Sequence, residues 1–334
     1  MRVTLHLRAG VFRASAIVLA VMLVGRPAAA QSINGALDIL LPVGARAAAM
    51  GTAIVAERGG ESIWWNPAGI ARLAKPEFAI DHFSSAFIES GDAASLVLPV
   101  GPIGVFAVGA RLFNYGGQVA KDNNNIETGT ASTRSTVLSS SFAASFGERF
   151  SAGLTFRLYQ FAAICSGICG DALLVAGDFT TGMLDAGVQY RTSPTSPLEF
   201  GAVMSNLGPS LQVHDLAQAD ALPTTIRVGL SYRPTSTSWD PAIRLRTTAE
   251  FVTTPSLSNK EIHLGGELGY VAGDATLTLR GGYIYQQAGT LDSSAQPSVG
   301  FGIASGRVQL DFAQLFDPAA LGKPPRYVSI RLGL

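Results

Sequence analysis

The chain has little charge and no long apolar run beyond its first 30 residues. Asp, Glu, Lys and Arg together make up 14% of the 334 residues, whereas soluble domains carry about 25%. No segment of the remainder has 18 consecutive apolar residues, which argues against a membrane protein built from spanning helices. The net charge is +0 and basic clusters are missing, so nothing points to nucleic acid as a partner. Low charge without spanning helices is typical of a protein that meets lipid through alternate residues of its strands.

Motifs of catalysis and of cofactor binding are missing as well. The chain has no G-x-S-x-G elbow, no H-E-x-x-H and no P-loop. Beyond residue 30 the histidines are His82, His214 and His263. A Ser/His/acid set drawn from them carries little weight, because Ser is frequent throughout the chain. We therefore expect no enzyme, no cofactor and no metal site.

The N-terminus has the parts of an export signal. Arginines precede an apolar run at residues 14–24, and Ala28-Ala29-Ala30 supplies a small-residue cleavage site before Gln31. The apolar run is shorter than the roughly 20 residues that a spanning helix needs. Residues 1–30 are therefore predicted to be a signal peptide, with a retained N-terminal anchor as the alternative.

Cysteine is scarce, with Cys165 and Cys169 as the complete set. An exported protein sits in a compartment that permits disulfides. Two cysteines four apart, with Gly167 between them, can close a small loop, so we expect a structural disulfide. A redox or metal pair is a weaker alternative because no His or acidic cluster accompanies the cysteines. Two free thiols are the third reading.

Residues 76–334 are dominated by alternating segments, with apolar and polar residues on opposite faces. The clearest is 150–159, where Phe156 and Leu158 face one way and Thr155 and Arg157 the other. Fourteen such segments are predicted as strands, at residues 76–89, 92–100, 103–115, 134–146, 149–162, 172–191, 198–206, 223–233, 242–253, 261–272, 275–287, 297–304, 307–315 and 325–334. The charges that recur on the polar faces are predicted to face a lumen: Arg157, Arg244, Arg246, Glu250, Glu267, Arg280, Arg307 and Asp311.

The connections between these segments also fit a barrel in the outer membrane of a Gram-negative-type bacterium, where periplasmic turns are short and external loops long. With the N-terminus in the periplasm, the short turns at 100–102, 147–148, 273–274 and 305–306 all fall on the periplasmic side. The long polar segments 116–133, 207–222, 288–296 and 316–324 all fall outside, and the cysteine pair lands on an external loop. The predicted fold is an all-β transmembrane antiparallel β-barrel of about 14 strands.

Residues 31–75 do not alternate and are predicted to form a plug inside the barrel. Small residues surround one arginine, in the stretch Gly44, Ala45, Arg46, Ala47, Ala48, Ala49, Met50, Gly51. Such residues let a backbone approach other elements closely, and about 14 strands leave a lumen wide enough to hold them. A buried Arg46 needs an acid or carbonyls. The candidate acids on the wall are Glu250, Glu267 and Asp311.

The second part of this segment reads Trp64, Trp65, Asn66, Pro67, Ala68, Gly69. Pro67 disfavours helix for the residue before it. The Asn-Pro-Ala-Gly run is therefore either a hinge of the plug or a plain helix stop before the first strand. The two tryptophans have three readings, as packing in the lumen, as a wall for a ligand or as interfacial anchors.

The motifs at 44–51 and 65–69 resemble those of the PorV/PorQ family of outer-membrane proteins, part of the wider FadL-like barrel group. The family pattern is roughly G-A-R-A-x-x-M-G followed by an aromatic residue and N-P-A-G. Further similarities are Ser205-Asn206-Leu207-Gly208 and Leu279-Arg280-Gly281-Gly282-Tyr283. The resemblance implies a 14-stranded barrel with an N-terminal hatch.

Two functions follow from this resemblance. PorV-type members imply the handling of secreted cargo proteins and secretion-machinery partners in a type IX-like secretion or surface-assembly pathway. FadL-type members imply transport of small hydrophobic molecules across the outer membrane. We take protein handling as the first hypothesis and transport as its alternative, with outer-membrane lipid as a partner in both cases. A mainly structural barrel is a third reading.

Overall fold

The computed structural model describes residues 36–84, 89–122, 124–169, 178–211, 220–234, 240–287, 294–316 and 324–334. These residues all belong to one compact unit, Asn34–Leu334. The predicted signal peptide at 1–30 and residues 31–35 of the predicted plug lie outside the described residues. Among the residues that the structure describes, no helix is long and apolar enough to cross a membrane.

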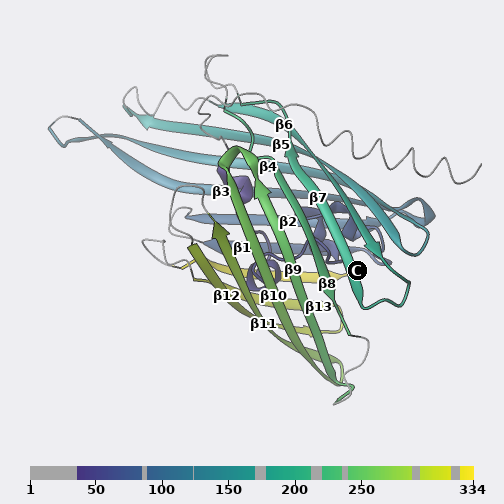
Figure 1. Cartoon of the computed structure of the whole chain (residues 1–334). Helices are drawn as coiled ribbons and strands as arrows, with labels where there is room; N and C mark the ends of the chain where they lie inside the picture. The colour runs from purple at the N-terminus through teal and green to yellow at the C-terminus, as the bar shows by residue number, and fades with distance from the viewer. Residues whose placement is uncertain are drawn as a thin grey trace, which may run out of the picture. The chain divides into compact units, whose positions relative to one another are not determined.

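The described strands form one closed antiparallel barrel (Figure 1). Each strand pairs with its neighbours in the sequence, and the last strand pairs with the first to close the ring. The strands are β1 (Glu77–Ser84), β2 (Ser90–Pro99), β3 (Val105–Lys121), β4 (Glu127–Phe146), β5 (Phe150–Gly167), β6 (Phe179–Arg191), β7 (Leu198–Leu207), β8 (Thr225–Tyr232), β9 (Ile243–Thr254), β10 (Asn259–Ala272), β11 (Ala275–Gln287), β12 (Ser294–Ser305), β13 (Val308–Leu315) and β14 (Arg326–Gly333). The predicted fold class, an antiparallel barrel of 14 strands, is confirmed.

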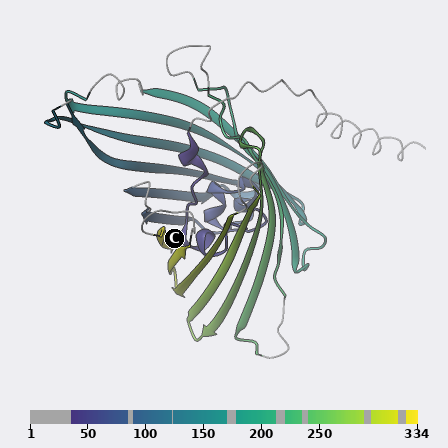
Figure 2. The same cartoon turned by 60° about the vertical axis from the view of Figure 1, so that its left-hand side comes forward.

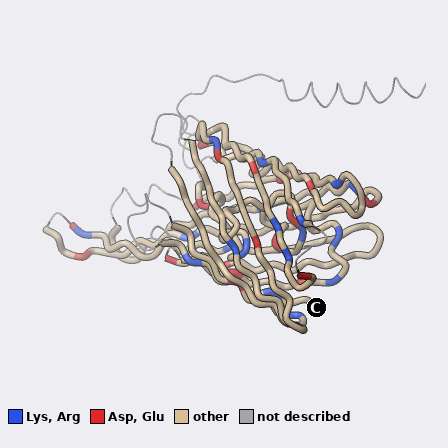
Figure 3. Tube along the Cα trace, turned by 60° about the horizontal axis from the view of Figure 1, so that its bottom comes forward, with Lys and Arg blue, Asp and Glu red and all other residues tan. Residues whose placement is uncertain are grey.

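Alternation along each strand separates an apolar outer face from a polar inner face. In β5, Phe156 is 55% exposed, whereas its neighbours Thr155 and Arg157 are 0% and 3% exposed. Successive side chains of a strand point to opposite faces, so the exposed apolar residues lie outside the ring and the buried polar residues inside it. In Figure 3, where charged positions are blue and red, most of the trace is tan.

The two ends of the barrel differ in their connections. The turns at Gly147, Gly273 and Gly306 join β4 to β5, β10 to β11 and β12 to β13, and these glycines have φ of 65°, 61° and 59°. Such positive φ values favour glycine, which allows these turns to be tight. We call this end the short-turn end and the opposite one the long-connection end. They correspond to the predicted periplasmic and external sides.

The hairpin between β3 and β4 extends further than the sequence indicated. Residues 116–133 were predicted to be an external loop, but β3 continues to Lys121 and β4 already begins at Glu127. That prediction is wrong. The stretch is rich in Gly and Asn, which are depleted in strands, and these residues obscure its ability to pair, although its Thr residues favour strands. Figures 1 and 2 show β3, β4 and β5 reaching well beyond the other strands.

Residues 36–75, called here the N-terminal segment, contain no strand. They form the short helices η2 (Leu37–Leu40), α2 (Ala45–Ala49), η3 (Gly60–Trp64) and η4 (Pro67–Ile70). In Figure 2 this segment is the purple ribbon among the strands. Ala47, Ala48 and Met50 are all 0% exposed, and a Cβ added at Gly51 would meet the backbone nitrogen of Tyr283 at 2.7 Å. The small residues therefore let the segment's backbone approach the wall closely.

Candidate functional site inside the barrel

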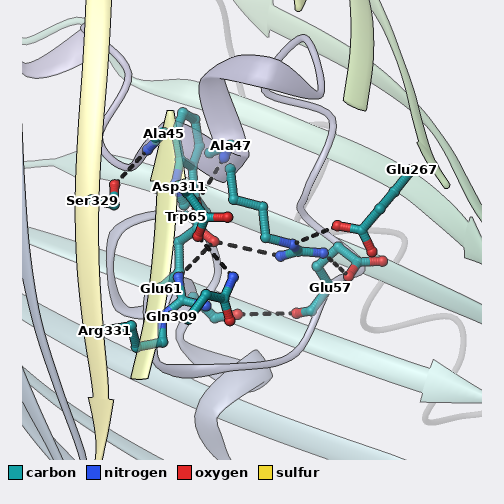
Figure 4. Close-up of polar contacts among 12 residues, drawn as sticks. Ala45, Ala47, Glu57, Glu61, Trp65, Glu267, Gln309, Asp311, Ser329 and Arg331 are labelled. Atoms are coloured by element: carbon teal, nitrogen blue, oxygen red, sulfur yellow. Dashed lines mark hydrogen bonds and ion pairs between the residues drawn. The ribbon is translucent and has the colours of Figure 1, made fainter. Parts of the chain in front are cut away.

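Arg46, on α2, ties the N-terminal segment together and binds it to the wall. It is 7% exposed and pairs with three carboxylates. Its Nη2 lies 2.6 Å from Glu57 Oε2, its Nη1 3.4 Å from Glu61 Oε2, and its Nε 3.4 Å from Glu267 Oε2 on β10. Figure 4 shows these three acids converging from the segment and the wall. A buried guanidinium needs such partners, because an unpaired buried charge is strongly destabilising.

The three wall carboxylates expected as candidates for this role differ in their contacts. Glu267 pairs with Arg46 as described. Glu250 instead pairs with Arg227 at 2.7 Å and accepts a hydrogen bond from the backbone of the segment at Val55. Asp311 pairs with Arg280 at 2.6 Å. Sequence alone could not choose among them, because the choice depends on which strands lie opposite α2.

Wall residues extend these ion pairs into a continuous system. Arg246 lies 2.6 Å from Glu267 and 3.3 Å from Glu57, and Arg331 lies 3.2 Å from Glu61. We define the lumenal charge network as Arg46, Glu57, Glu61, Glu77, Arg246, Glu267, Arg280, Asp311 and Arg331. Figure 4 shows Glu61, Asp311 and Arg331 on one side of this network and Glu57 and Glu267 on the other.

Glu57 is the most strongly perturbed acid of the N-terminal segment. Burial alone would raise its pKa. The charges of Arg46, Arg246 and Arg233 and a hydrogen bond from the Ser231 hydroxyl outweigh burial and lower the pKa from 4.5 to about 2. Glu57 is therefore ionised at neutral pH and stabilises the docked segment as an anion.

Further ion pairs and hydrogen bonds join the segment to the wall. Arg58 lies 2.6 Å from Glu199 on β7, and Arg233 binds the other oxygen of the same carboxylate at 2.6 Å. Arg157 on β5 pairs with Asp185 at 2.6 Å and donates a hydrogen bond to the backbone carbonyl of Trp64 at 3.2 Å. The segment is thus held by several strands around the ring.

The Asn-Pro-Ala-Gly motif lies between η3 and η4. Asn66 caps η4, since its Oδ1 accepts a hydrogen bond from the Ala68 backbone at 3.1 Å, and Pro67 occupies the first turn. The Asn66 Nδ2 also donates to the carbonyls of Val55 at 2.7 Å and Val188 on β6 at 3.1 Å. The motif therefore separates η3, which ends at Trp64, from η4, which Asn66 caps, and it bonds this part of the segment to the wall. The hinge reading stays a prediction.

The two tryptophans are packed inside the barrel. Trp65 donates from Nε1 to the Val43 carbonyl at 3.2 Å, and the Arg227 guanidinium lies 5.0 Å from the centre of its ring. Trp64 is 6% exposed, and a Cβ added at Gly109 on β3 would meet its ring at 2.5 Å. Both indoles lie away from the outer face, so they are not interfacial anchors. Both also line a small cavity.

Aromatic side chains gather inside the barrel at the long-connection end. Phe83 is the next-to-last residue of β1 and stacks on Tyr327 with ring centres 5.4 Å apart, while Phe179 begins β6 and stacks on Phe161 at 5.2 Å. We call this group the aromatic lining: Phe83, Phe113, Tyr115, Tyr159, Phe161, Phe179 and Tyr327. Ile39 and Leu41 of the N-terminal segment pack against it. Sites for small hydrophobic molecules are lined mostly by apolar and aromatic side chains such as these.

Two cavities differ in character. One of about 300 Å³ adjoins the lumenal charge network towards the short-turn end, where Thr276, Thr278 and Gln309 line it together with network arginines. The other, of about 40 Å³, lies between Trp64, Trp65 and the wall near the aromatic lining. Within the described part of the chain, no group of three or more His, Cys, Asp or Glu side chains is placed to hold a metal ion.

Two of the predicted lumen-facing charges are exposed at the short-turn end of the barrel. Arg244 is exposed near the start of β9, where its guanidinium donates to the carbonyls of Pro241 and Ile243. Arg307 is exposed in the turn between β12 and β13 rather than on a strand. Both occupy positions that alternation assigns to the inner face, but they lie at the end of the barrel, where their side chains reach solvent. The other predicted charges lie inside: Arg157, Arg246, Glu250, Glu267, Arg280 and Asp311.

The structure joins Cys165 and Cys169 in a disulfide. Cys165 lies on β5 and Cys169 just beyond its end, so the bond is at the tip of the protruding strands rather than within a free loop. Ala120 on β3 and Ala131 on β4 pack against it. The disulfide therefore closes a small loop at the end of β5 and lies next to β3 and β4. These are the three longest of the described strands.

His263 on β10 links the wall to the N-terminal segment. Its Nδ1 lies 2.7 Å from the Thr52 hydroxyl and its Nε2 lies 2.6 Å from Glu261. A Thr-His-Glu set at these distances has the order of a catalytic triad, but Thr52 and His263 are 3% and 2% exposed. Neither lines the two cavities described above. The arrangement fastens the segment.

His82 lies on β1 with its Nδ1 2.7 Å from Asp92, and His214 lies outside the described residues.

Sequence reasoning missed Arg111. This residue is 2% exposed on β3 and donates to the carbonyls of Ile39 at 3.4 Å, Asp38 at 3.5 Å and Leu41 at 3.2 Å, so it holds η2. Its position could have been found from alternation, because it lies two residues before the inward-facing Phe113. Its contacts with backbone carbonyls could not have been found from the sequence.

Comparison with known proteins relates the fold to channels and transporters. No protein-family model matches the chain, and no curated protein matches its sequence. Solved structures do match. The toluene transporter TbuX of Ralstonia pickettii is 14% identical over 87% of this chain and 98% of its own, with a TM-score of 0.53. The monoaromatic hydrocarbon channel CymD is 13% identical over 87% and 97%, with a TM-score of 0.57.

A homologue of FadL from Pseudomonas aeruginosa also matches, at 11% identity over 87% of this chain and 98% of its own, with a TM-score of 0.53. At these identities the likeness establishes the fold alone. The barrel has the fold of the FadL-like group. The finer resemblance to PorV/PorQ proteins has no counterpart among these structures.

Proposed function

We propose that the protein lies in the outer membrane of a Gram-negative-type bacterium and transports small hydrophobic molecules through its barrel. The observation that carries this proposal is the aromatic lining inside the long-connection end. It places apolar and aromatic side chains within the lumen, packed against Ile39 and Leu41 of the N-terminal segment. The exposed apolar outer face of the strands supports a place in lipid.

The fold neighbours favour transport over protein handling. Those with the fold of this barrel are described as toluene transporters, a monoaromatic hydrocarbon channel and a FadL homologue. The sequence hypothesis of cargo handling in a type IX-like pathway has no comparable support, so transport, its alternative, becomes the proposed function. Catalysis has no part in this proposal.

The N-terminal segment is the gate in this proposal. It occupies the ring of strands between the aromatic lining and the short-turn end, and ion pairs to several strands hold it there. A solute that enters from the long-connection end therefore meets η2 first. The test is planar-bilayer conductance of the intact protein and of a variant that joins the signal peptide directly to Pro76. We expect small conductance from the first and large channels from the second. A folded variant that conducts no more than the intact protein would show that the segment does not close the lumen.

Transport itself is tested by uptake into cells that carry the protein in their outer membrane. The initial rate for radiolabelled ethylbenzene should exceed that of cells without the protein. Phe161→Ser, in the aromatic lining, should lower the rate severalfold because it removes apolar contact area. Gln160→Ser is the matched control, since Gln160 is the exposed neighbour on the outer face of β5. Equal rates with and without the protein would overturn the proposed function.

A further inference from the structure

The small cavity beside the tryptophans is bordered by three residues that each have a hydrogen-bond donor without a partner. It measures about 40 Å³ and is bordered by Trp64, Trp65, Arg111 and Arg157. Among the described residues, the Trp64 Nε1 and the Nε atoms of Arg111 and Arg157 have no hydrogen-bond partner. These three side chains are 6%, 2% and 3% exposed. Bulk water therefore does not satisfy them.

Three unsatisfied donors at one cavity call for an acceptor. A buried donor left without a partner costs about 1–3 kcal/mol, and most buried polar side-chain atoms in native structures have one. Since all three groups are N–H donors, the missing group must offer lone pairs. A volume of about 40 Å³ holds roughly three water-sized positions. That space suits the oxygen end of a small organic molecule.

Charge around the cavity is balanced. The arginines and acids that surround it are Arg111, Arg157, Arg227, Asp38, Asp185 and Glu250. Arg157 pairs with Asp185 at 2.6 Å and Arg227 with Glu250 at 2.7 Å. Asp38 lies on the turn whose carbonyls Arg111 binds, and it accepts a hydrogen bond from Tyr159 at 3.0 Å. The three arginines and three acids are equal in number, so an anion would leave this group of charges with an excess negative charge at a desolvated place. A neutral acceptor adds no charge to the cavity.

One side of the cavity is apolar and leads to the aromatic lining. Ile39 and Leu41 border the cavity and also pack against the lining. Trp64 and Trp65 add to this apolar side, while Ser205, Asn206, Thr225 and Arg227 lie on the rest of the border. A ligand with its oxygen among the donors would therefore direct its apolar body along Ile39 and Leu41.

We propose that this cavity binds the oxygen acceptor of a neutral aromatic molecule, such as an aryl ketone or ester. The proposal rests on the proposed function and narrows its substrate class. Donors without partners select for a molecule with an acceptor over a hydrocarbon of the same size, because the hydrocarbon would leave them unsatisfied. The balanced charge selects against the corresponding carboxylate.

The test uses three ligands of similar size: acetophenone as the neutral acceptor, ethylbenzene as the hydrocarbon and benzoate as the anion. Binding of each radiolabelled ligand to the purified full-length protein in detergent is measured by equilibrium dialysis. We expect acetophenone to bind most tightly and benzoate most weakly.

Trp64→Phe tests the site itself. It removes one unpartnered donor and keeps an aromatic ring. Loss of one hydrogen bond of about 1 kcal/mol should weaken acetophenone about fivefold and leave ethylbenzene unchanged. Trp65→Phe is the matched control, because the Trp65 donor already bonds Val43. It should leave the acetophenone-to-ethylbenzene affinity ratio as in the wild type. The ratio is insensitive to partial loss of folded protein.

The outcomes of this test distinguish a failure of the inference from a failure of the proposed function on which it rests. Ethylbenzene binding as tight as acetophenone, with a ratio that Trp64→Phe does not change, overturns the inference and leaves transport of hydrophobic molecules standing. Tightest binding by benzoate also overturns it, because the site would then be an anion site. Failure of all three ligands to bind overturns the proposed function and the inference together.

Discussion

Glu57→Gln is the most informative single substitution in the N-terminal segment. It keeps the size of the side chain and its capacity to accept a hydrogen bond from Ser231, but it removes the negative charge next to Arg46 and Arg246. The pKa of Glu57 falls from 4.5 to about 2 when it is in place. That shift corresponds to about 3 kcal/mol of stabilisation at neutral pH, at about 1.4 kcal/mol per unit. Breaking a buried pair costs a similar amount, about 3–5 kcal/mol.

This loss should act on the docking of the segment rather than on the barrel. The strands are held by their own ladder of hydrogen bonds around a closed ring, whereas Glu57 joins the segment to the wall. A change of about 3 kcal/mol shifts the docked-to-released equilibrium by about a hundredfold. At pH 7 the variant should therefore show more open-channel time in planar bilayers and faster proteolysis within residues 36–75.

The lowered pKa of Glu57 determines the direction of a pH effect on the docking of the segment. A carboxylate with a lowered pKa stabilises the docked state fully above its free value of 4.5, and this contribution is lost as the pH falls towards about 2. The wild-type channel should therefore open as the pH falls through that window. Glu57→Gln should already be open at pH 7 and respond less to acid. Glu148→Gln, at an exposed turn, is the control. A Glu57→Gln protein that conducts and resists protease like the wild type at pH 7 would refute the electrostatic docking of the segment.

Three further substitutions test the faces of the wall and the disulfide. Leu279→Arg should impair assembly, because Leu279 is 64% exposed on the outer face and Arg on the lipid face costs about 2–4 kcal/mol near the midplane. Thr278→Arg should assemble, because Thr278 borders the cavity of about 300 Å³ inside the barrel. Equal yields of heat-resistant barrel on unboiled gels would contradict this assignment of faces. Cys165 and Cys169 should resist thiol labelling until reduced, and Cys165→Ser should still assemble, since a loop this short adds little stability. Labelling without reductant would argue against the disulfide.

Much of the wall could be predicted from the sequence, because alternation has a direct physical cause. Lipid outside and polar groups inside impose a period of two on every strand, and β5 shows it without error from Phe150 to Leu158. The pattern fails where both faces are wet. Residues 116–133 extend β3 and β4 beyond the rest of the barrel without a regular apolar face, and their Gly and Asn content is typical of a loop.

The interior was less predictable, because it depends on distances across the ring. Small residues around Arg46 indicated close packing and a need for acids, and both features are present. The sequence could not reveal that Glu57 and Glu61 would be two of its partners. Nor could it reveal Arg111, whose partners are backbone carbonyls. Such contacts leave no pattern in side-chain chemistry.

The N-terminal segment is held unequally at its two ends, and this bears on how a solute could pass. Near the aromatic lining, η2 is held by Arg111 through carbonyl contacts of 3.2 to 3.5 Å. Further along, α2 is held by Arg46 through carboxylates as close as 2.6 Å. A guanidinium binds a carboxylate more strongly than a neutral carbonyl when both are buried, because both partners are then charged. An acceptor that enters the small cavity would bond the unpartnered Nε of Arg111, so it acts at the weaker attachment. The lumenal charge network then determines whether the rest of the segment follows, which is why neutralising Glu57 should open the channel without any solute.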